Sequence, residues 1–247
     1  MRFSLRFLPL LFVTLTFTVP SPAQQFDEKM WGRNSPGVEL ATHEEPRTHD
    51  AGKTIVMYNI VGKGFPTDKK YDLWFWNLGK KPQKGIQGVS FDKRGLMVCS
   101  GKPGDCIGKG PDDAINIQAA AMLGEAKRFG VVSTDGRVAG FVDAVPFPIE
   151  ATDKKCKLSV VRDQPMAEVV TVSASGLVPF ELLKVTGNFG AEQTTHSPTV
   201  SPQGTWQAVM GVKSPGQDAG TATIKVTGQA CSMSLSFPWG EGSNKPQ

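Results

Sequence analysis

Few residues in this sequence have the types and spacing that catalysis or metal binding requires. His43 and His49 lie six positions apart with Pro46 between them, whereas a helical zinc-protease site needs two histidines four positions apart on one helical face. His196 lies in a short polar stretch before a proline, which indicates a loop, and no Gly-x-Ser-x-Gly elbow supplies a nucleophile for it. We therefore expect a solvated linker around His43 and His49, and no catalytic residue, metal site or cofactor.

A glycine-rich segment and scattered acidic residues offer weaker possibilities. The segment 104–110 is one residue short of a phosphate-binding loop, ends in glycine where such a loop has Ser or Thr, and precedes no helical pattern. A solvated acidic loop is favoured over a calcium site, because no regular spacing relates Asp105, Asp112 and Asp113. A hydrolase is the weakest functional alternative, and it would use acids such as Asp143, Glu150 and Asp153.

The four cysteines point to disulfides. Their even number suits an oxidising compartment, and they lack the tight Cys-x2-Cys pairs with partner histidines that a zinc site needs. Of the three possible connectivities we favour Cys99 with Cys106, because the glycines and proline between them indicate a pinned hairpin, and this leaves Cys156 with Cys231. Loop-closure entropy assigns about 2.5 kcal/mol to the short bridge and about 4.5 kcal/mol to the long one.

Residues 1–23 have the pattern of a secretory signal. Arg2 and Arg6 precede an apolar run of about 13 residues, and small residues up to Ala23 suit cleavage there. The run is shorter than the roughly 20 residues that a membrane-spanning helix needs. The formal charge of +4 becomes +2 without these two arginines, and the scattered lysines do not form the basic face that nucleic-acid binding requires. We expect an exported protein, periplasmic or extracellular, with no membrane span in the mature chain.

Residues 24–51 mix polar residues with two prolines, and we expect them to form an extended arm or linker. From residue 52 onward, short alternating apolar segments are separated by Gly, Pro and Asp turns, which is typical of strands. We expect two β units at 52–150 and 151–240, the first carrying an insertion at roughly 99–118, and a tail at 241–247.

The two expected units repeat one pattern of turns. Each has a Gly-Phe or Gly-Leu turn closed by proline, near Gly64 and Gly176, followed by a strand that begins seven residues after the glycine. Each then has an Asp/Ser-x-x-Gly turn, ending at Gly95 and Gly204, and a final apolar strand. This pattern resembles the bacterial immunoglobulin-like domains of exported proteins. The resemblance implies an all-β chain of two tandem immunoglobulin-like antiparallel β-sandwiches, and a role in adhesion, ligand display or spacing.

The strand at 71–77 carries the most informative side chains. Alignment of the two units places Tyr71 and Leu73 toward the core and Asp72, Trp74 and Trp76 outward. Two outward tryptophans are costly unless something covers them. The interpretation that we favour is a cover by the neighbouring unit or the N-terminal arm, and the alternatives are a protein partner or a stacked sugar.

These observations together predict a non-enzymatic exported protein that acts as a binding, adhesion or structural spacer module. The partner would be an unknown protein or glycan, and the candidate binding residues are Asp72, Trp74 and Trp76. The main alternative is a carbohydrate-binding protein that uses the exposed tryptophan strand.

Overall fold

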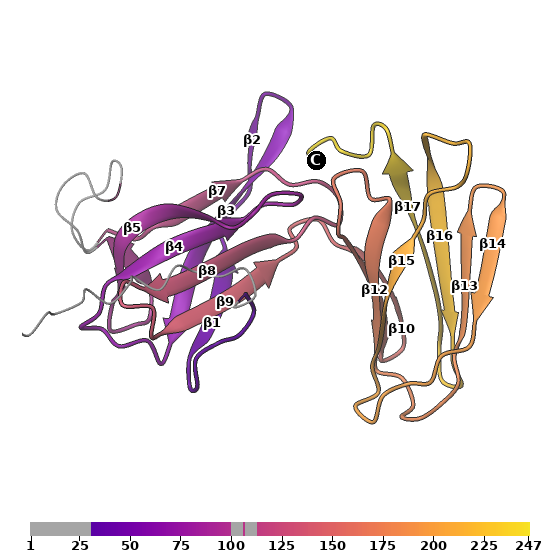
Figure 1. Cartoon of the computed structure of the whole chain (residues 1–247), viewed down its shortest axis with the longest axis horizontal. Coiled ribbons are helices and arrows are strands. Elements are labelled where there is room, and N and C mark those ends of the chain that lie inside the picture. The colour runs from indigo at the N-terminus through magenta and orange to yellow at the C-terminus, as the bar shows by residue number, and fades with distance from the viewer. Residues whose placement is uncertain (1–30, 100–105, 107–112) are drawn as a thin grey trace, which may run out of the picture.

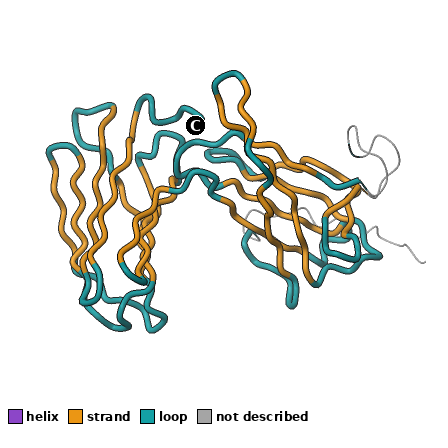
Figure 2. Tube along the Cα trace, turned by 180° about the vertical axis from the view of Figure 1, so that it is seen from behind, coloured by secondary structure: helices purple, strands orange, loops and turns teal. Residues whose placement is uncertain are grey.

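The computed structural model describes residues 31–99, 106 and 113–247, and these residues form strands and no helix (Figure 1 and Figure 2). The paired strands are all antiparallel, and they gather into two sandwich-like modules, β1 to β9 and β10 to β17. The expected all-β class is thus confirmed. The expected signal sequence lies outside the described residues. Across the described residues, no helix has the length and apolar character needed to cross a bilayer.

The first module combines two sheets around one core. One sheet has the order β1-β3-β2 with β7 also on β3, and the other has the order β6-β5-β4-β8-β9. Alternate residues of β3, including Val56, Tyr58 and Ile60, point inward and share a core with Leu73 and Phe129 of the second sheet. This period of two is the reason that the segment forms a strand. The strands are β1 (Glu39–Glu44), β2 (Thr48–Asp50), β3 (Lys53–Lys63), β4 (Tyr71–Trp76), β5 (Gln83–Phe91), β6 (Met97–Cys99), β7 (Asn116–Ala119), β8 (Lys127–Ser133) and β9 (Ala139–Ala144).

Part of the segment expected to be an arm or linker belongs to this module. β1 pairs with the second half of β3, and β2 pairs with its beginning. Val38 and Leu40 are buried in the core, so two apolar side chains on one face anchor the strand. Apart from Ala41, the other residues of β1 are polar, and most of them are exposed, so a search for apolar alternation does not find the strand. Residues 39–50 therefore contain two paired strands where the sequence indicates a linker.

The second module is a sandwich of two four-stranded sheets. Their orders are β10-β11-β12-β15 and β14-β13-β16-β17. The expected alternation is observed: Leu158 and Val160 of β11 and Ile224 and Val226 of β16 are buried in one shared core. The strands are β10 (Ile149–Asp153), β11 (Cys156–Arg162), β12 (Val169–Ser175), β13 (Lys184–Phe189), β14 (Glu192–His196), β15 (Trp206–Gly211), β16 (Ala219–Thr227) and β17 (Ser232–Gly240).

The two modules share a strand order. β1, β3 and β7 are arranged like β11, β12 and β15, and β5-β4-β8-β9 are arranged like β14-β13-β16-β17. The turn that was aligned by sequence also recurs, since the Gly95 N–H donates to the Asp92 carbonyl and the Gly204 N–H donates to the Ser201 carbonyl, at 2.9 and 3.0 Å. The repeated sequence pattern therefore corresponds to a repeated topology.

Both expected disulfides are present. Cys99 at the end of β6 is bonded to Cys106, and Cys156 at the start of β11 is bonded to Cys231 just before β17. Because these sulfur atoms are bonded to one another, they cannot act as the thiolate ligands of a zinc site. The pair Cys156–Cys231 connects the two sheets of the second module.

A buried arginine connects the modules to the C-terminal residues. The Arg162 guanidinium, only 1% exposed, donates to the carbonyls of Leu123, Pro165 and Ser243 at 2.7, 2.8 and 3.1 Å. The Gln247 N–H donates to the Ala121 carbonyl at 3.0 Å, and its carbonyl accepts from the Thr54 N–H at 2.7 Å. The segment 241–247, expected to be a tail, is thus hydrogen-bonded to the first module.

Candidate functional site

Strand β4 places the predicted binding residues on the outer face of the five-stranded sheet. Tyr71 and Leu73 are fully buried in the core, so the alternate residues Asp72, Trp74 and Trp76 point to the opposite face. Asp72 is itself buried, and both indoles are half-buried. The sheet register sets Trp74 opposite Lys84 of β5 and Trp76 opposite Arg128 of β8, so two cations flank the tryptophans.

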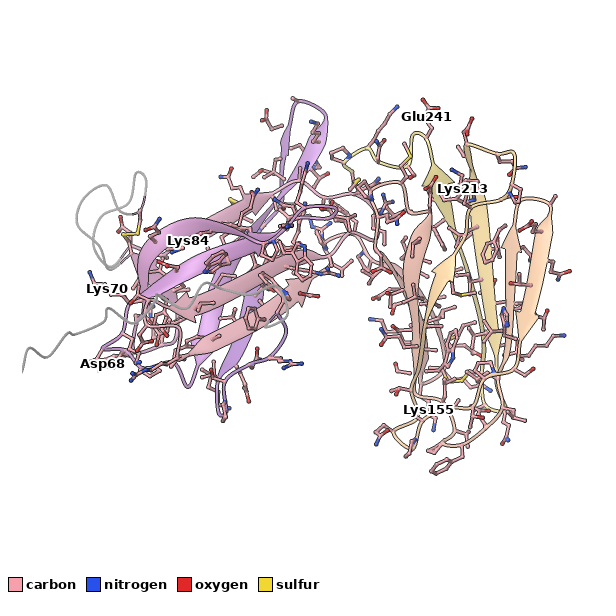
Figure 3. The ribbon with its side chains drawn as sticks, viewed as in Figure 1. Asp68, Lys70, Lys84, Lys155, Lys213 and Glu241 are labelled. Carbon is pink, nitrogen blue, oxygen red and sulfur yellow. A yellow bond between two sulfur atoms is a disulfide. The ribbon has the colours of Figure 1, made fainter. Side chains whose placement is uncertain are left out.

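The two cations lie over the indole rings. The Lys84 ammonium is 5.5 Å from the Trp74 ring centre and forms an ion pair with Asp72 at 2.6 Å. The Arg128 guanidinium is 5.1 Å from the Trp76 ring centre. At these distances the ring quadrupole attracts the cation. Figure 3 shows Lys84 over β4 and β5 on the broad side of the first module.

A third tryptophan from the N-terminal segment covers part of this face. Trp31 contacts Trp76 edge-on, with ring centres 5.3 Å apart, and packs against Phe141 of β9 at 5.1 Å. Gly130 of β8 provides the room, because a Cβ atom there would lie 3.3 Å from Trp31 and collide with Phe141. Trp31, Trp74, Trp76, Lys84 and Arg128 together are called the tryptophan face below.

Hydrogen bonds to the backbone of β9 fix the segment that carries Trp31. The Ser35 N–H donates to the Ala139 carbonyl, and the Asn34 side chain accepts from the Phe141 N–H, both at 2.8 Å. These bonds also occupy the otherwise open edge of β9. The N-terminal segment is therefore one of the covers that the sequence allowed for the outward tryptophans.

Asp143 of β9 adds a titratable group at the border of the face. Burial raises the pKa of this carboxyl, while the Arg128 guanidinium and a hydrogen bond from Trp31 act in the opposite direction. The Arg128 Nε atom lies 3.4 Å from the Asp143 carboxylate. Because Asp143 contacts both Arg128 and Trp31, its charge is coupled to the position of the tryptophan cover.

The tryptophan face can bind by stacking, by cation–π contact and by ion pairing. The acids considered for a hydrolase are not brought together. Asp143 lies on β9, Glu150 forms an ion pair with Lys157 at 2.8 Å, and Asp153 accepts from the Ser232 N–H at 2.8 Å. Among the described residues no cluster of three or more His, Cys, Asp or Glu side chains could hold a metal ion.

The three histidines and the acidic loop are also dispersed. His43 and His49 lie on β1 and β2, both paired with β3, so the solvated linker expected there is instead sheet. His196 ends β14 and is not in the expected loop. Asp105 and Asp112 lie outside the described residues, whereas the backbone carbonyl of Asp113 accepts from the Cys99 N–H at 3.0 Å.

Sequence reasoning missed Trp31, Arg128 and Phe141. Arg128 could have been found, because alternation along β8 sets it on the same face as Gly130 and Val132. Trp31 carried no such signal, since no periodic pattern surrounds it and its partners lie far along the chain.

The comparisons with known proteins concern the fold. Neither a protein-family model nor a curated protein matches this sequence. A solved tetra-tandem repeat from the extending region of a large adhesion protein is 10% identical, with 83% of this chain and 50% of that chain covered and a TM-score of 0.28. A DUF3823 family protein from Bacteroides ovatus ATCC 8483 is 8% identical over 83% of this chain and 98% of that one, with a TM-score of 0.22.

The alpha chain of the chicken interferon gamma receptor is a further match, 9% identical over 81% of this chain and 96% of that one, with a TM-score of 0.22. This chain spans about half the length of the adhesion-protein structure. Similarities of this size carry no argument about function.

Proposed function

We propose that this chain is an exported, non-enzymatic pair of immunoglobulin-like modules that binds a protein partner through the tryptophan face, as an adhesion or spacer protein. Two disulfides support export, because such bonds persist in oxidising compartments. Two antiparallel sheets packed face to face, with strands such as β12 and β15 paired across long connections, support the immunoglobulin-like assignment.

The composition of the tryptophan face carries the proposal. Tryptophan and arginine are the residues that contribute most often to the energetic centres of protein interfaces. Trp74, Trp76 and Arg128 lie together on one rigid sheet, so little ordering entropy is lost when they bind. Lys84 and Arg128 occupy indole faces that a sugar ring would need for stacking, which favours a protein over a glycan.

A site-specific cross-linking experiment tests the proposal. A photoreactive amino acid replaces Lys84 in the purified chain, and a second preparation carries it at Lys225, an exposed position of β16 in the other module. Both are incubated with the envelope and extracellular proteins of the source organism and irradiated. We expect one protein to be cross-linked from position 84 and not from position 225.

Two variants separate binding from folding. Trp74→Ala and Arg128→Ala should abolish the cross-link while the thermal midpoint stays within a few degrees of the wild type. Equal labelling from positions 84 and 225, or a cross-link that survives both variants, would refute the proposal. Loss of the cross-link on addition of a free oligosaccharide would instead assign the face to carbohydrate.

A further inference from the structure

One lateral side of the second module is open. β14 and β15 are edge strands of the two sheets, and among the described residues each has a paired strand on one side only. A groove of about 400 Å³ lies between them, and its lining includes Val185, Phe189, His196, Trp206, Ala208 and Met210. β14 is the outermost strand of this module in Figure 1. The opposite side is closed, because the Ser232 N–H bonds to Asp153 and Cys156 is bonded to Cys231.

The same side of the first module is filled by a strand. In the shared strand order, β5 and β7 correspond to β14 and β15. β6 pairs with β5, and its other edge bonds to the residues before β7, since the Cys99 and Ile115 N–H groups donate to the Asp113 and Met97 carbonyls at 3.0 Å. All three residues of β6 are buried.

Chain length explains the difference between the modules. β7 begins 21 residues after Gly95, whereas β15 begins 2 residues after the equivalent Gly204. The 19 additional residues (21 minus 2) supply the closing strand β6 and the disulfide loop. The second module has the two corresponding edges without this segment, so the groove is a place for a strand that the described residues leave unfilled.

We propose that the groove between β14 and β15 binds an extended strand of a partner polypeptide, on the side of the module that β6 closes in the first module. β6, which pairs with the last three residues of β5 (Val89–Phe91), indicates the chemistry of the occupant: an uncharged apolar segment like Met97-Val98-Cys99, which would pair antiparallel with β14. Strand addition of this kind draws affinity from backbone hydrogen bonds and specificity from alternate side chains.

The residues of the two edge strands β14 and β15 suit an extended apolar strand as the occupant. β15 contains neither a charged residue nor a proline, the devices that normally protect an edge strand from pairing, and its Val209 is 68% exposed. The Thr194 hydroxyl of β14 is buried at the groove, and no residue that the structure describes forms a hydrogen bond with it. An antiparallel strand would present its carboxyl-terminal end to Glu192, so a basic residue at that end has complementary charge.

A peptide copied from the closing strand tests the proposal. The probe has the sequence of residues 95–99 with Cys99→Ser, an acetylated start and one added lysine at an amidated end. It is titrated into the full mature chain while backbone amide exchange is followed. We expect saturable protection of β14 and β15, with no change at β10 and β17. A second peptide, with proline in place of Val98, should bind at least about tenfold more weakly, because proline lacks the backbone N–H.

Two neighbouring variants provide a matched comparison. Ala208→Glu sets a carboxylate in the groove and should weaken binding at least about tenfold. Gln207→Glu adds the same charge at an exposed position outside the groove lining, and should leave the affinity within about twofold. The proline peptide requires no variant, so the comparison stands even if Ala208→Glu fails to fold.

Three outcomes would overturn the assignment. The first is an absence of protection at millimolar peptide, and the second is equal affinity for the two peptides. The third is self-association of the unliganded chain in sedimentation that Ala208→Glu abolishes, which would make the occupant a second copy of this chain. None of these results concerns the tryptophan face, so they leave the proposed function of the first module untouched.

Discussion

Replacement of Arg162 by alanine should destabilise the whole chain by about 3 kcal/mol. The guanidinium is buried and donates to three carbonyls, of Leu123, Pro165 and Ser243. A buried acceptor left without a partner costs about 1–3 kcal/mol, so three of them set an upper range of roughly 3–9 kcal/mol. Water that enters the vacated space would recover part of this cost, and the loss of a buried charge would offset another part.

The electrostatic setting of Arg162 supports the lower end of that range. Burial lowers the pKa of the guanidinium, which means that the charged form is penalised, and the Glu125 carboxylate only partly opposes this effect. Removal of Arg162 relieves the desolvation penalty and leaves Glu125 with its ion pair to Lys127 at 2.6 Å. Arg162→Lys keeps a charge but has a single donor group, so its stability should lie between those of the wild type and the alanine variant.

Urea unfolding followed by tryptophan fluorescence and circular dichroism measures the effect. With a slope of about 3 kcal/mol per molar urea, a loss of 3 kcal/mol shifts the midpoint by about 1 M. If the two modules unfold in separate steps, the midpoint shift should appear in the step that unfolds the second module. The contact between the two modules should also be lost at a lower urea concentration. Amide exchange adds a local readout, since the Thr54 N–H bonded to Gln247 should exchange faster.

Arg94→Ala is the matched control, because the Arg94 side chain is 79% exposed and forms an ion pair with Asp92 at the surface. Its free energy of unfolding should stay within about 0.5 kcal/mol of the wild type. The reasoning about Arg162 fails if its alanine variant matches this control, or if exchange at Thr54 does not change. Either result would mean that the junction does not depend on the buried guanidinium.

Three further predictions concern the disulfides, the tyrosines and the tryptophan cover. Replacement of both Cys156 and Cys231 by serine should lower the free energy of unfolding by about 4.5 kcal/mol, because this disulfide closes the longer loop. The same change at Cys99 and Cys106 should lower it by about 2.5 kcal/mol. Urea unfolding of the two double variants shows which loss is larger. Burial raises the pKa of Tyr58 and of Tyr71 to about 12. Phenolate absorbance should therefore appear near pH 12 for the native chain, and near pH 10 for the chain unfolded in denaturant. Since the unfolded chain releases these protons first, stability should be unaffected below pH 10 and fall as pH rises toward 12. Trp31→Ala should increase acrylamide quenching of the remaining tryptophans, because Trp76 loses its edge-on neighbour, and unchanged quenching would contradict the cover.

Local alternation predicted the parts of the fold that depend on it. The inward and outward sets of β4 follow from a period of two, and so do Leu158, Val160, Ile224 and Val226 in the second core. The disulfide Cys99–Cys106 was predictable because only six residues, among them two glycines and a proline, separate the two cysteines. The turn chemistry of Gly95 and Gly204 revealed the repeat, since both glycines adopt positive φ in equivalent turns.

Contacts between distant segments were not predictable in this way. β1 has only Leu40 buried within its bounds, and its partner β3 supplies the rest of its environment. Trp31 lies beside Trp76 because Asn34 and Ser35 form hydrogen bonds with β9, more than 100 residues further along the chain. The sequence predicts an insertion at roughly 99–118, but it does not show that β6 closes the first module. Three apolar residues look the same in a sequence whether they close a sheet or line a loop.

The two disulfides lie at different places in the two modules, and these places match the sides that are closed. In the first module Cys99 ends β6, so the bond to Cys106 fixes the strand that closes its lateral side. In the second module Cys156 and Cys231 are on the side where β10 and β17 already lie close, so the covalent bond reinforces the closed side and leaves β14 and β15 free. A covalent bond on one side holds the sheets together, and it allows the other side to admit a strand without separating them. The same strand order can therefore give one module whose side is closed by its own chain and one whose side is available to another.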